Sequence, residues 1–393
     1  MTKKIIVLLG VILLCSLSLS MPLYAEITGE QPSNPEIVDL AEEIDLTEVQ
    51  DLLNQLDKDI QEALPDFSLT KTFANLLKGE LNLNPDNVGR SILKAILNEV
   101  VVNGPLIAKL LALAVICAVI NQLQYAFSGD VSKLAQMLVY LVLLGLAISS
   151  FKMAVDIGNE AIDNMVAFMQ AILPVMLTVL LAMGNIASAA LFKPIIMGSL
   201  VFLATVMKNV VLPLFFLSVV LRLFNNISPS FKLGKFSSLL EFGGKLSTGI
   251  VLTVFIGIMA IHGVTGGVAD GVTLRTAKYS VDLIPVVGKF FKDAVEIVVG
   301  SGIMLKNALG VVAMLAIVII IFAPIIKIIA MMFTFKIAAA LVEPLGENQL
   351  ADSLQDMSKG LLYIFAAVAS VGVMFFITIT IIIGAGNLSV MLR

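Results

Sequence analysis

Residues 308–332 read ALGVVAMLAIVIIIFAPIIKIIAMM, and Lys327 is the single charged side chain among them. At about 1.5 Å of rise per residue, a helix of this length extends roughly 37 Å, which is enough to cross the roughly 30 Å hydrocarbon core of a bilayer. Backbone in hydrocarbon must satisfy its hydrogen bonds internally, so a helix is the expected conformation. The run therefore predicts a transmembrane helix and an α-helical membrane fold.

Other apolar runs repeat this pattern along the chain. Hydrophobic residues make up 59% of the sequence, which is more than soluble globular proteins usually carry. Further spans are expected at residues 105–125, 133–151, 164–183, 247–267 and 360–384. Together they predict an all-α, polytopic membrane domain of about seven to eight spans over residues 104–393.

The run at residues 188–224 is harder to divide into spans. A single helix of this length would extend roughly 55 Å, which is too long for one crossing of the hydrocarbon core. Lys208-Asn209 interrupts the run and predicts a tight turn between two short spans.

The first 25 residues have the pattern of a secretory signal peptide. Lys3 and Lys4 precede an apolar stretch, and Ala25 provides a small residue at the expected cleavage point. Leu23 fits the position three residues before cleavage poorly, so an uncleaved signal anchor is the alternative. Cleavage would leave Cys117 as the one cysteine, which we interpret as a small core residue.

Residues 26–103 differ from the rest in charge. They carry sixteen acidic and five basic residues, whereas residues 104–393 carry thirteen acidic and eighteen basic ones. Thr47 and Gln50 fit a helix-capping pattern, and apolar residues then recur at helical spacing. We expect a small, acidic, helical domain outside the cytoplasm that docks on the membrane domain or on a partner.

Residues 270–310 mix charged residues with short apolar blocks between two long apolar runs. Such a segment rarely faces lipid along its whole length, so we expect interfacial or re-entrant helices that turn at Pro285 and at the glycines Gly288, Gly300 and Gly302. This is the candidate functional segment, and the charged residues singled out in it are Arg275, Lys278, Asp282, Lys289, Lys292, Glu296 and Lys306. For Glu296, an ion pair with Lys292 one helical turn earlier is the simpler interpretation.

Two further residues are candidate polar groups within the membrane. Lys327 lies deep in its apolar run. One interpretation is a side chain that is buried or faces a cavity, and the alternative is a side chain that snorkels to the headgroups. His262 is the one histidine of the chain, and an interfacial hydrogen bond is the alternative to a proton-relay or ligand role. Asp156, Glu160 and Asp163 share one side of a helix and predict a solvated face.

The sequence contains no familiar catalytic pattern. One histidine excludes a metalloprotease HExxH motif and a multi-histidine metal site, and there is no glycine-rich nucleotide loop. We therefore expect no enzyme activity and no cofactor or metal.

Orientation depends on the number of spans. With an external amino terminus and a turn at Lys208-Asn209, residues 222–245 would be cytoplasmic, as their basic side chains prefer. Residues 270–310 would then lie outside the cytoplasm. If residues 188–224 instead form one span, both assignments are reversed.

Two blocks resemble a known family. The run LLKGELNLNPDNVGRSILKAILNEVVVNGPLIAKLLALAVICAVINQLQYAF at residues 76–127 is similar to the entry region of the stage III sporulation protein AE family. The run TLRTAKYSVDLIPVVGKFFKDAVEIVVGSGIMLKNALG at residues 273–310 resembles that family's most recognisable block. The order of signal, short acidic domain and spans also agrees.

The resemblance implies a role in endospore formation. Members of the family are expected in the mother cell membrane around the forespore, in a secretion-like channel or feeding-tube complex that supports late forespore gene expression. Implied partners are other membrane and intermembrane-space proteins, a secretion-type ATPase on the cytoplasmic side, and membrane lipid, but no nucleic acid. The acidic helices would face the intermembrane space.

Two alternatives of other classes stay open. Proline-interrupted spans and deep lysines would also suit a stand-alone secondary transporter or permease. Such a protein would have paired broken helices in two matching halves, and the similarity of KPIIMG at residue 193 to APIIKI at residue 323 is only a faint sign of them. A passive scaffold, whose spans merely anchor the acidic domain, is the second.

Overall fold

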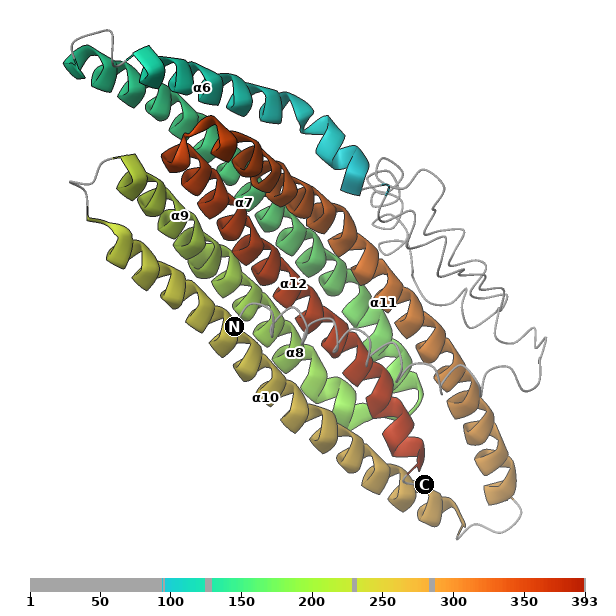
Figure 1. Ribbon diagram of the computed structural model, residues 1–393. Helices are drawn as coiled ribbons and strands as arrows, with labels where there is room; N and C mark the ends of the chain where they lie inside the picture. Colours follow the sequence, from blue (N-terminus) through green and yellow to red (C-terminus); the bar gives the residue numbers. More distant parts are fainter. Residues whose placement is uncertain (1–93, 95, 124–128, 228–231, 283–286, 392–393) are drawn as a thin grey trace. The chain divides into compact units, whose positions relative to one another are not determined.

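Helices form the described part of the protein, and four of them, with 44 to 56 residues each, are much longer than a bilayer is thick (Figure 1). A computed structural model describes residues 94, 96–123, 129–227, 232–282 and 287–391. The chain divides into two units, Met1–Asp45 and Leu46–Arg393, and all described residues belong to the second. The predicted signal peptide and most of the acidic domain at residues 26–103 lie outside the described residues.

The described elements are all helical, as the apolar runs predict. Their bounds are α6 Gly104–Leu123, α7 Gly129–Ala182, α8 Ile186–Val206, the π-helix η1 Met207–Val211, α9 Leu212–Ile227, α10 Gly234–Asp282, α11 Val287–Val342, the 3₁₀-helix η2 Glu343–Leu345, and α12 Asn348–Met391.

Five of the described helices are long and apolar enough to cross a membrane, and a sixth candidate is a bent pair. The pair joins Ile96–Val102 to Gly104–Ile120 at an angle of 50°. The protein is thus a multi-pass α-helical membrane protein, and in its described residues the candidate spans are fewer and longer than the seven to eight expected for the chain.

Two predicted boundaries differ from the structure. The expected spans at residues 133–151 and 164–183 belong to the single helix α7. The predicted turn at Lys208-Asn209 is wrong, because both residues lie in η1 and the chain stays helical from α8 into α9. A π-helix accommodates one extra residue in a turn without reversing the chain, so a polar pair in an apolar run need not be a turn.

Glycines reverse the chain at two helix ends. Gly184, between α7 and α8, and Gly346, between η2 and α12, have φ values of 82° and 84°. This left-handed conformation strains residues that have a Cβ atom, and glycine adopts it freely. Both turns are short, so the helices they join run antiparallel.

The longest contact is between α11 and α12 (Figure 1). A Cβ atom on Gly310 would collide with Ile383, and one on Gly372 would collide with Ile321. Both contacts have the same antiparallel register, so glycines let the two helices approach closely at two levels.

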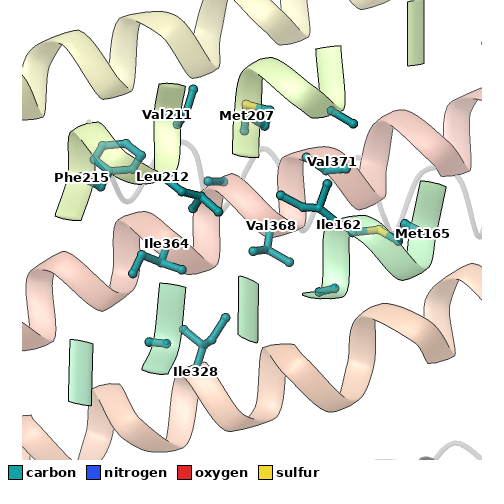
Figure 2. Packing of buried hydrophobic residues seen from close by; sticks show 14 of the residues in the cluster. Ile162, Met165, Met207, Val211, Leu212, Phe215, Ile328, Ile364, Val368 and Val371 are labelled. Atoms are coloured by element: carbon teal, nitrogen blue, oxygen red, sulfur yellow. The ribbon is translucent and has the colours of Figure 1, made fainter. Parts of the chain in front are cut away.

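The core lies where α12 passes between the other helices. Aliphatic and thioether side chains from five elements meet there, and Figure 2 labels Ile162, Met165, Met207, Val211, Leu212, Phe215, Ile328, Ile364, Val368 and Val371. Gly158 of α7 faces Val368 and Ile364 of α12 at this level. Cys117 is also buried, as predicted, at 1% exposure.

Antiparallel packing brings particular helix ends together. We call the end of the bundle at which α12 begins the near end, and the end at which it finishes the far end. Tyr140 in the first part of α7 contacts Ser353 of α12, and Glu241 in the first part of α10 contacts Tyr363 of α12. Arg222 in the last part of α9 contacts Glu241 and Asp356. The starts of α7 and α10 and the finish of α9 therefore lie at the near end. Lys306 near Ile383, and Gly302 near Met183, place the first part of α11 and the finish of α7 at the far end.

Candidate functional site

The candidate segment at residues 270–310 is divided between two long helices. α10 ends at Asp282 and α11 begins at Val287, so Arg275, Lys278 and Asp282 lie on α10. Gly288, Lys289, Lys292 and Glu296 lie on the first turns of α11. The turns predicted at Gly288, Gly300 and Gly302 are wrong, because all three glycines lie within this continuous helix. Pro285 and the side chains of these charged residues lie outside what the structure describes. An interfacial or re-entrant position for this segment stays a prediction.

Lys306 is the member of this segment whose side chain is described. It is completely buried, and its Nζ atom donates a hydrogen bond to the carbonyl oxygen of Ile383 at 2.6 Å. The bond joins α11 to α12 one turn before the close approach at Gly310. A buried charge needs such partners, so Lys306 has a structural part in the α11–α12 contact.

The other two candidate polar residues are not brought together. Lys327 is exposed on the outer surface of α11, so the buried alternative is wrong for this residue. His262 is half-buried on α10. Asp156, Glu160 and Asp163 are all exposed on α7, and contact of this face with water stays a prediction.

Instead, the structure assembles a polar site at the near end from three helices. Arg222 of α9 bridges Glu241 of α10 and Asp356 of α12, with nitrogen–oxygen distances of 2.8 Å and 3.6 Å. The side chains of Glu241 and Asp356 are only 14% and 15% exposed. Two carboxylates so enclosed require a cation, and the planar guanidinium can serve both at once.

Glu241 has three partners around its carboxylate. Besides Arg222, it accepts a hydrogen bond from the Tyr363 hydroxyl at 2.7 Å and pairs with Lys245 one turn along α10. The Lys245 ammonium also lies 4.4 Å from the centre of the Tyr363 ring, within the range of a cation–π interaction. Both carboxylate oxygens are therefore satisfied.

Close packing beside Glu241 fixes the position of Tyr363. Its ring stacks on Phe215 of α9 with 5.3 Å between the ring centres. Phe215 can sit there because Gly244 of α10 has no side chain, and a Cβ atom would lie 2.6 Å from the Phe215 ring. Ser218 of α9 and Ser237 of α10 each donate a hydrogen bond to the other's carbonyl oxygen, and these two bonds join α9 to α10.

A second branch extends from Asp356 to α7. Asn226 donates to Asp356 at 3.5 Å and to the hydroxyl of Ser353 at 3.2 Å. Ser353 in turn hydrogen-bonds the hydroxyl of Tyr140 on α7, and Lys359 pairs with Asp356 at 3.3 Å. We call the whole set the near-end network, and its members are Tyr140, Arg222, Asn226, Glu241, Lys245, Ser353, Asp356, Lys359 and Tyr363.

This network can join α7, α9, α10 and α12 through charged and hydroxyl groups inside an otherwise apolar bundle. Ionisable residues within membrane helices are costly and mark functional positions by default. Among the described residues, no group of three His, Cys, Asp or Glu side chains could hold a metal ion.

Sequence reasoning missed the network as a site. Arg222 and Lys245 counted only as loop charges, and Glu241, Asp356 and Tyr363 were not singled out. The spacings Glu241–Lys245 and Asp356–Lys359 are local ion-pair signals, but the long-range partners were not visible.

A separate ion pair lies midway along the bundle. Lys208 of η1 and Asp163 of α7 are 2.5 Å apart, with side chains 34% and 57% exposed. The π-helix thus contains the lysine that was expected to form a turn.

Comparison with known proteins gives one consistent result. The sequence profile of the stage III sporulation protein AE family matches residues 67–386, which include every described helix from α6 to α11 and nearly all of α12. The stage III sporulation protein AE of Bacillus subtilis (strain 168) is 35% identical over 319 residues, covering 81% of this chain and 80% of that protein. No solved structure matches the chain significantly.

Proposed function

The chain belongs to the stage III sporulation protein AE family, and on that premise we propose that it is the multi-pass component of a secretion-like channel complex linking mother cell and forespore. Family membership supports a role in sporulation. The finer role, as a conduit or platform that sustains late forespore gene expression, is our proposal.

The observation that carries the proposal is the extent of the family match. It covers both ends of the bundle, including the near-end network and residues 270–310, so the likeness is not confined to a generic apolar span. Four helices joined by charged and hydroxyl groups suit a rigid wall or platform better than a set of independent anchors. The role proposed is non-enzymatic.

The proposed partners follow from the same premise. They are other membrane and intermembrane-space proteins of the complex, with a secretion-type ATPase on the cytoplasmic side. The protein would lie in the mother cell membrane around the forespore, with its acidic domain at residues 26–103 outside the cytoplasm.

The first test is genetic. Deleting the gene in the organism that carries it should reduce heat-resistant spores by at least a hundredfold and silence a late forespore reporter, and the wild-type gene should restore both. Normal spore yield after deletion would contradict the proposal.

A second test separates a channel platform from a passive scaffold or an independent transporter. Lys289→Glu with Lys292→Glu should reduce spore yield at least tenfold and weaken co-purification of the complex, while the amount of membrane-inserted protein stays normal. The control is Lys152→Glu, which reverses a charge of the same kind at an exposed position of α7. Intact co-purification with full spore yield would remove the segment from the proposal.

The acidic domain is tested separately. Removing residues 26–86 while keeping the signal should abolish association with the complex but leave the membrane domain inserted. Full sporulation without these residues would contradict the docking role.

A further inference from the structure

The charges at the near end are sorted between the inside and the outside of the bundle. In the near-end network, the side chains of Glu241 and Asp356 are 14% and 15% exposed. Their lysine partners Lys245 and Lys359 are 42% and 51% exposed. The carboxylates therefore point inward and the ammonium groups outward.

Three more exposed lysines lie at the same end. Lys232 precedes α10 and Lys235 lies in its first turn. Lys336 is on α11, and the register set by Gly310–Ile383 and Gly372–Ile321 places it level with Met357, two residues from Lys359. With Lys245 and Lys359 they form what we call the lysine collar.

The same stretches of the chain expose few acidic residues that would offset the positive charge of the lysine collar. In the described stretches 232–245 and 336–359, the exposed acids are Glu343 and Asp352, whereas Glu347 is buried at 5% exposure. The sequence over 222–245 and 336–359 has six basic and five acidic residues and so looks almost neutral. Folding gives its outer surface a net positive charge.

Apolar side chains on the outer surface accompany these lysines. α10 exposes Phe236, Leu239 and Phe242, and α11 exposes Phe333, Ile337 and Leu341. Such rows can enter the acyl region of a bilayer while neighbouring lysines extend their amines to the headgroups.

We propose that the lysine collar binds the headgroups of anionic phospholipids, with the near end at the cytoplasmic leaflet. The occupant is a lipid because apolar rows and lysines alternate on the same two helices, which suits a molecule with an acyl chain and a negative headgroup. Membrane protein loops rich in lysine favour the cytoplasmic side. This inference needs only a multi-pass protein and does not depend on the channel role.

The orientation has a consequence for the rest of the chain. If the near end is cytoplasmic, α10 leads outward and α11 leads back, so residues 270–310 at the far end lie outside the cytoplasm. That position would let the candidate segment meet partners in the intermembrane space.

Lipid binding is tested on the full-length protein in nanodiscs. Replacing phosphatidylcholine by 30% phosphatidylglycerol should raise the unfolding temperature, and native mass spectrometry should show retained phosphatidylglycerol. Each lysine near an anionic surface contributes about fivefold in affinity. The variant Lys232→Gln, Lys235→Gln, Lys336→Gln, Lys359→Gln should therefore lose at least tenfold in apparent affinity for phosphatidylglycerol.

The matched control is Glu343→Gln with Asp352→Asn, which removes the exposed acids of the same end and should leave binding equal or stronger. Ten millimolar inorganic phosphate should not displace the lipid, and displacement would indicate a free-phosphate site and overturn the proposal. No preference for phosphatidylglycerol in the wild type would also overturn it, and would leave an acidic protein face as the collar's partner.

Orientation is read by cysteine labelling in intact cells. Gln349→Cys, exposed at the start of α12, should react with a membrane-impermeant maleimide only after permeabilisation. Gly300→Cys, exposed near the far end, should react from outside. The wild-type protein sets the background from its own cysteines, the buried Cys117 and, where the signal is retained, Cys15. Labelling of Gln349→Cys from outside would overturn the cytoplasmic assignment.

Discussion

The near end and the far end of this bundle carry charge in opposite ways. At the far end, residues 270–310 hold their charges close together in sequence, which made them conspicuous. At the near end, Arg222, Glu241 and Asp356 come from three helices and become a site only when those helices pack. A charge pattern that is obvious in a sequence and a charge site that is built by a fold are therefore different features.

The two ends also differ in what their charges do within the bundle. At the near end, Arg222, Glu241 and Asp356 are largely enclosed and satisfy one another, so they should govern stability. Most charged residues of the far-end segment should act on partners, with Lys306 as the exception because it bonds α12. The substitutions that follow test this division, beginning with the largest expected effect.

Arg222→Met should be the most destabilising change. It leaves two largely enclosed carboxylates without their shared guanidinium, and breaking a buried pair in this way costs about 3 kcal/mol. The free energy of unfolding in detergent or nanodiscs measures it. Lys235→Met removes an exposed charge at the same end and should change stability by less than about 0.5 kcal/mol. Equal effects from the two would show that the network is not a stability element.

Gly360→Val should cost about 2 kcal/mol through overpacking. A Cβ atom at Gly360 of α12 would collide with Val219 of α9 and with the completely buried Phe151 of α7. The control is Gly198→Val on α8, where no atom lies within 4 Å of the added carbon. A stable Gly360→Val protein would mean that these helices separate readily.

Tyr363→Phe isolates one hydrogen bond of the network. The ring and its stacking on Phe215 are kept, and only the donor to Glu241 is lost, so a cost of about 1 kcal/mol is expected. A thermal unfolding series on the single and double variants with Lys245→Met would give the coupling energy. If Tyr363→Phe proves neutral, Arg222 and Lys245 alone satisfy Glu241.

Asp163→Asn should have the smallest effect. The Asp163–Lys208 pair is more than a third exposed on both sides, and exposed ion pairs contribute about 0.5 kcal/mol. Its contribution should fall further in high salt. A loss greater than about 2 kcal/mol, insensitive to salt, would instead place this pair in lipid, where it would act like the near-end network.

Much of the architecture could be predicted from sequence, and the failures have physical causes. Apolar runs such as residues 308–332 predicted helices because hydrocarbon permits little else. The turn predicted at Lys208-Asn209 was wrong because a lysine near the surface of a bundle can pair with Asp163 while its backbone stays helical. Helix continuity through residues 152–164 of α7 was missed because an exposed polar stretch can extend a helix as easily as end it.

The candidate site shows the same limit. Lys306 was singled out from sequence, but its partner, the carbonyl of Ile383, lies 77 positions away and has no side-chain signal. Lys327 looked deeply placed because its neighbours in sequence are apolar, whereas on the helix it occupies the exposed side. Local hydropathy does not report which face of a helix is covered.

The sequence by itself determined the membrane class, the helical conformation and the family, because these depend on composition and on ordered local patterns. Only the tertiary structure decided that Glu241 and Asp356 share one guanidinium, that Lys306 bonds α12, and that the lysines of the near end face outward while its central carboxylates face inward. These features arise from the rotation and register of helices that are distant in the chain, and packing alone fixes that register.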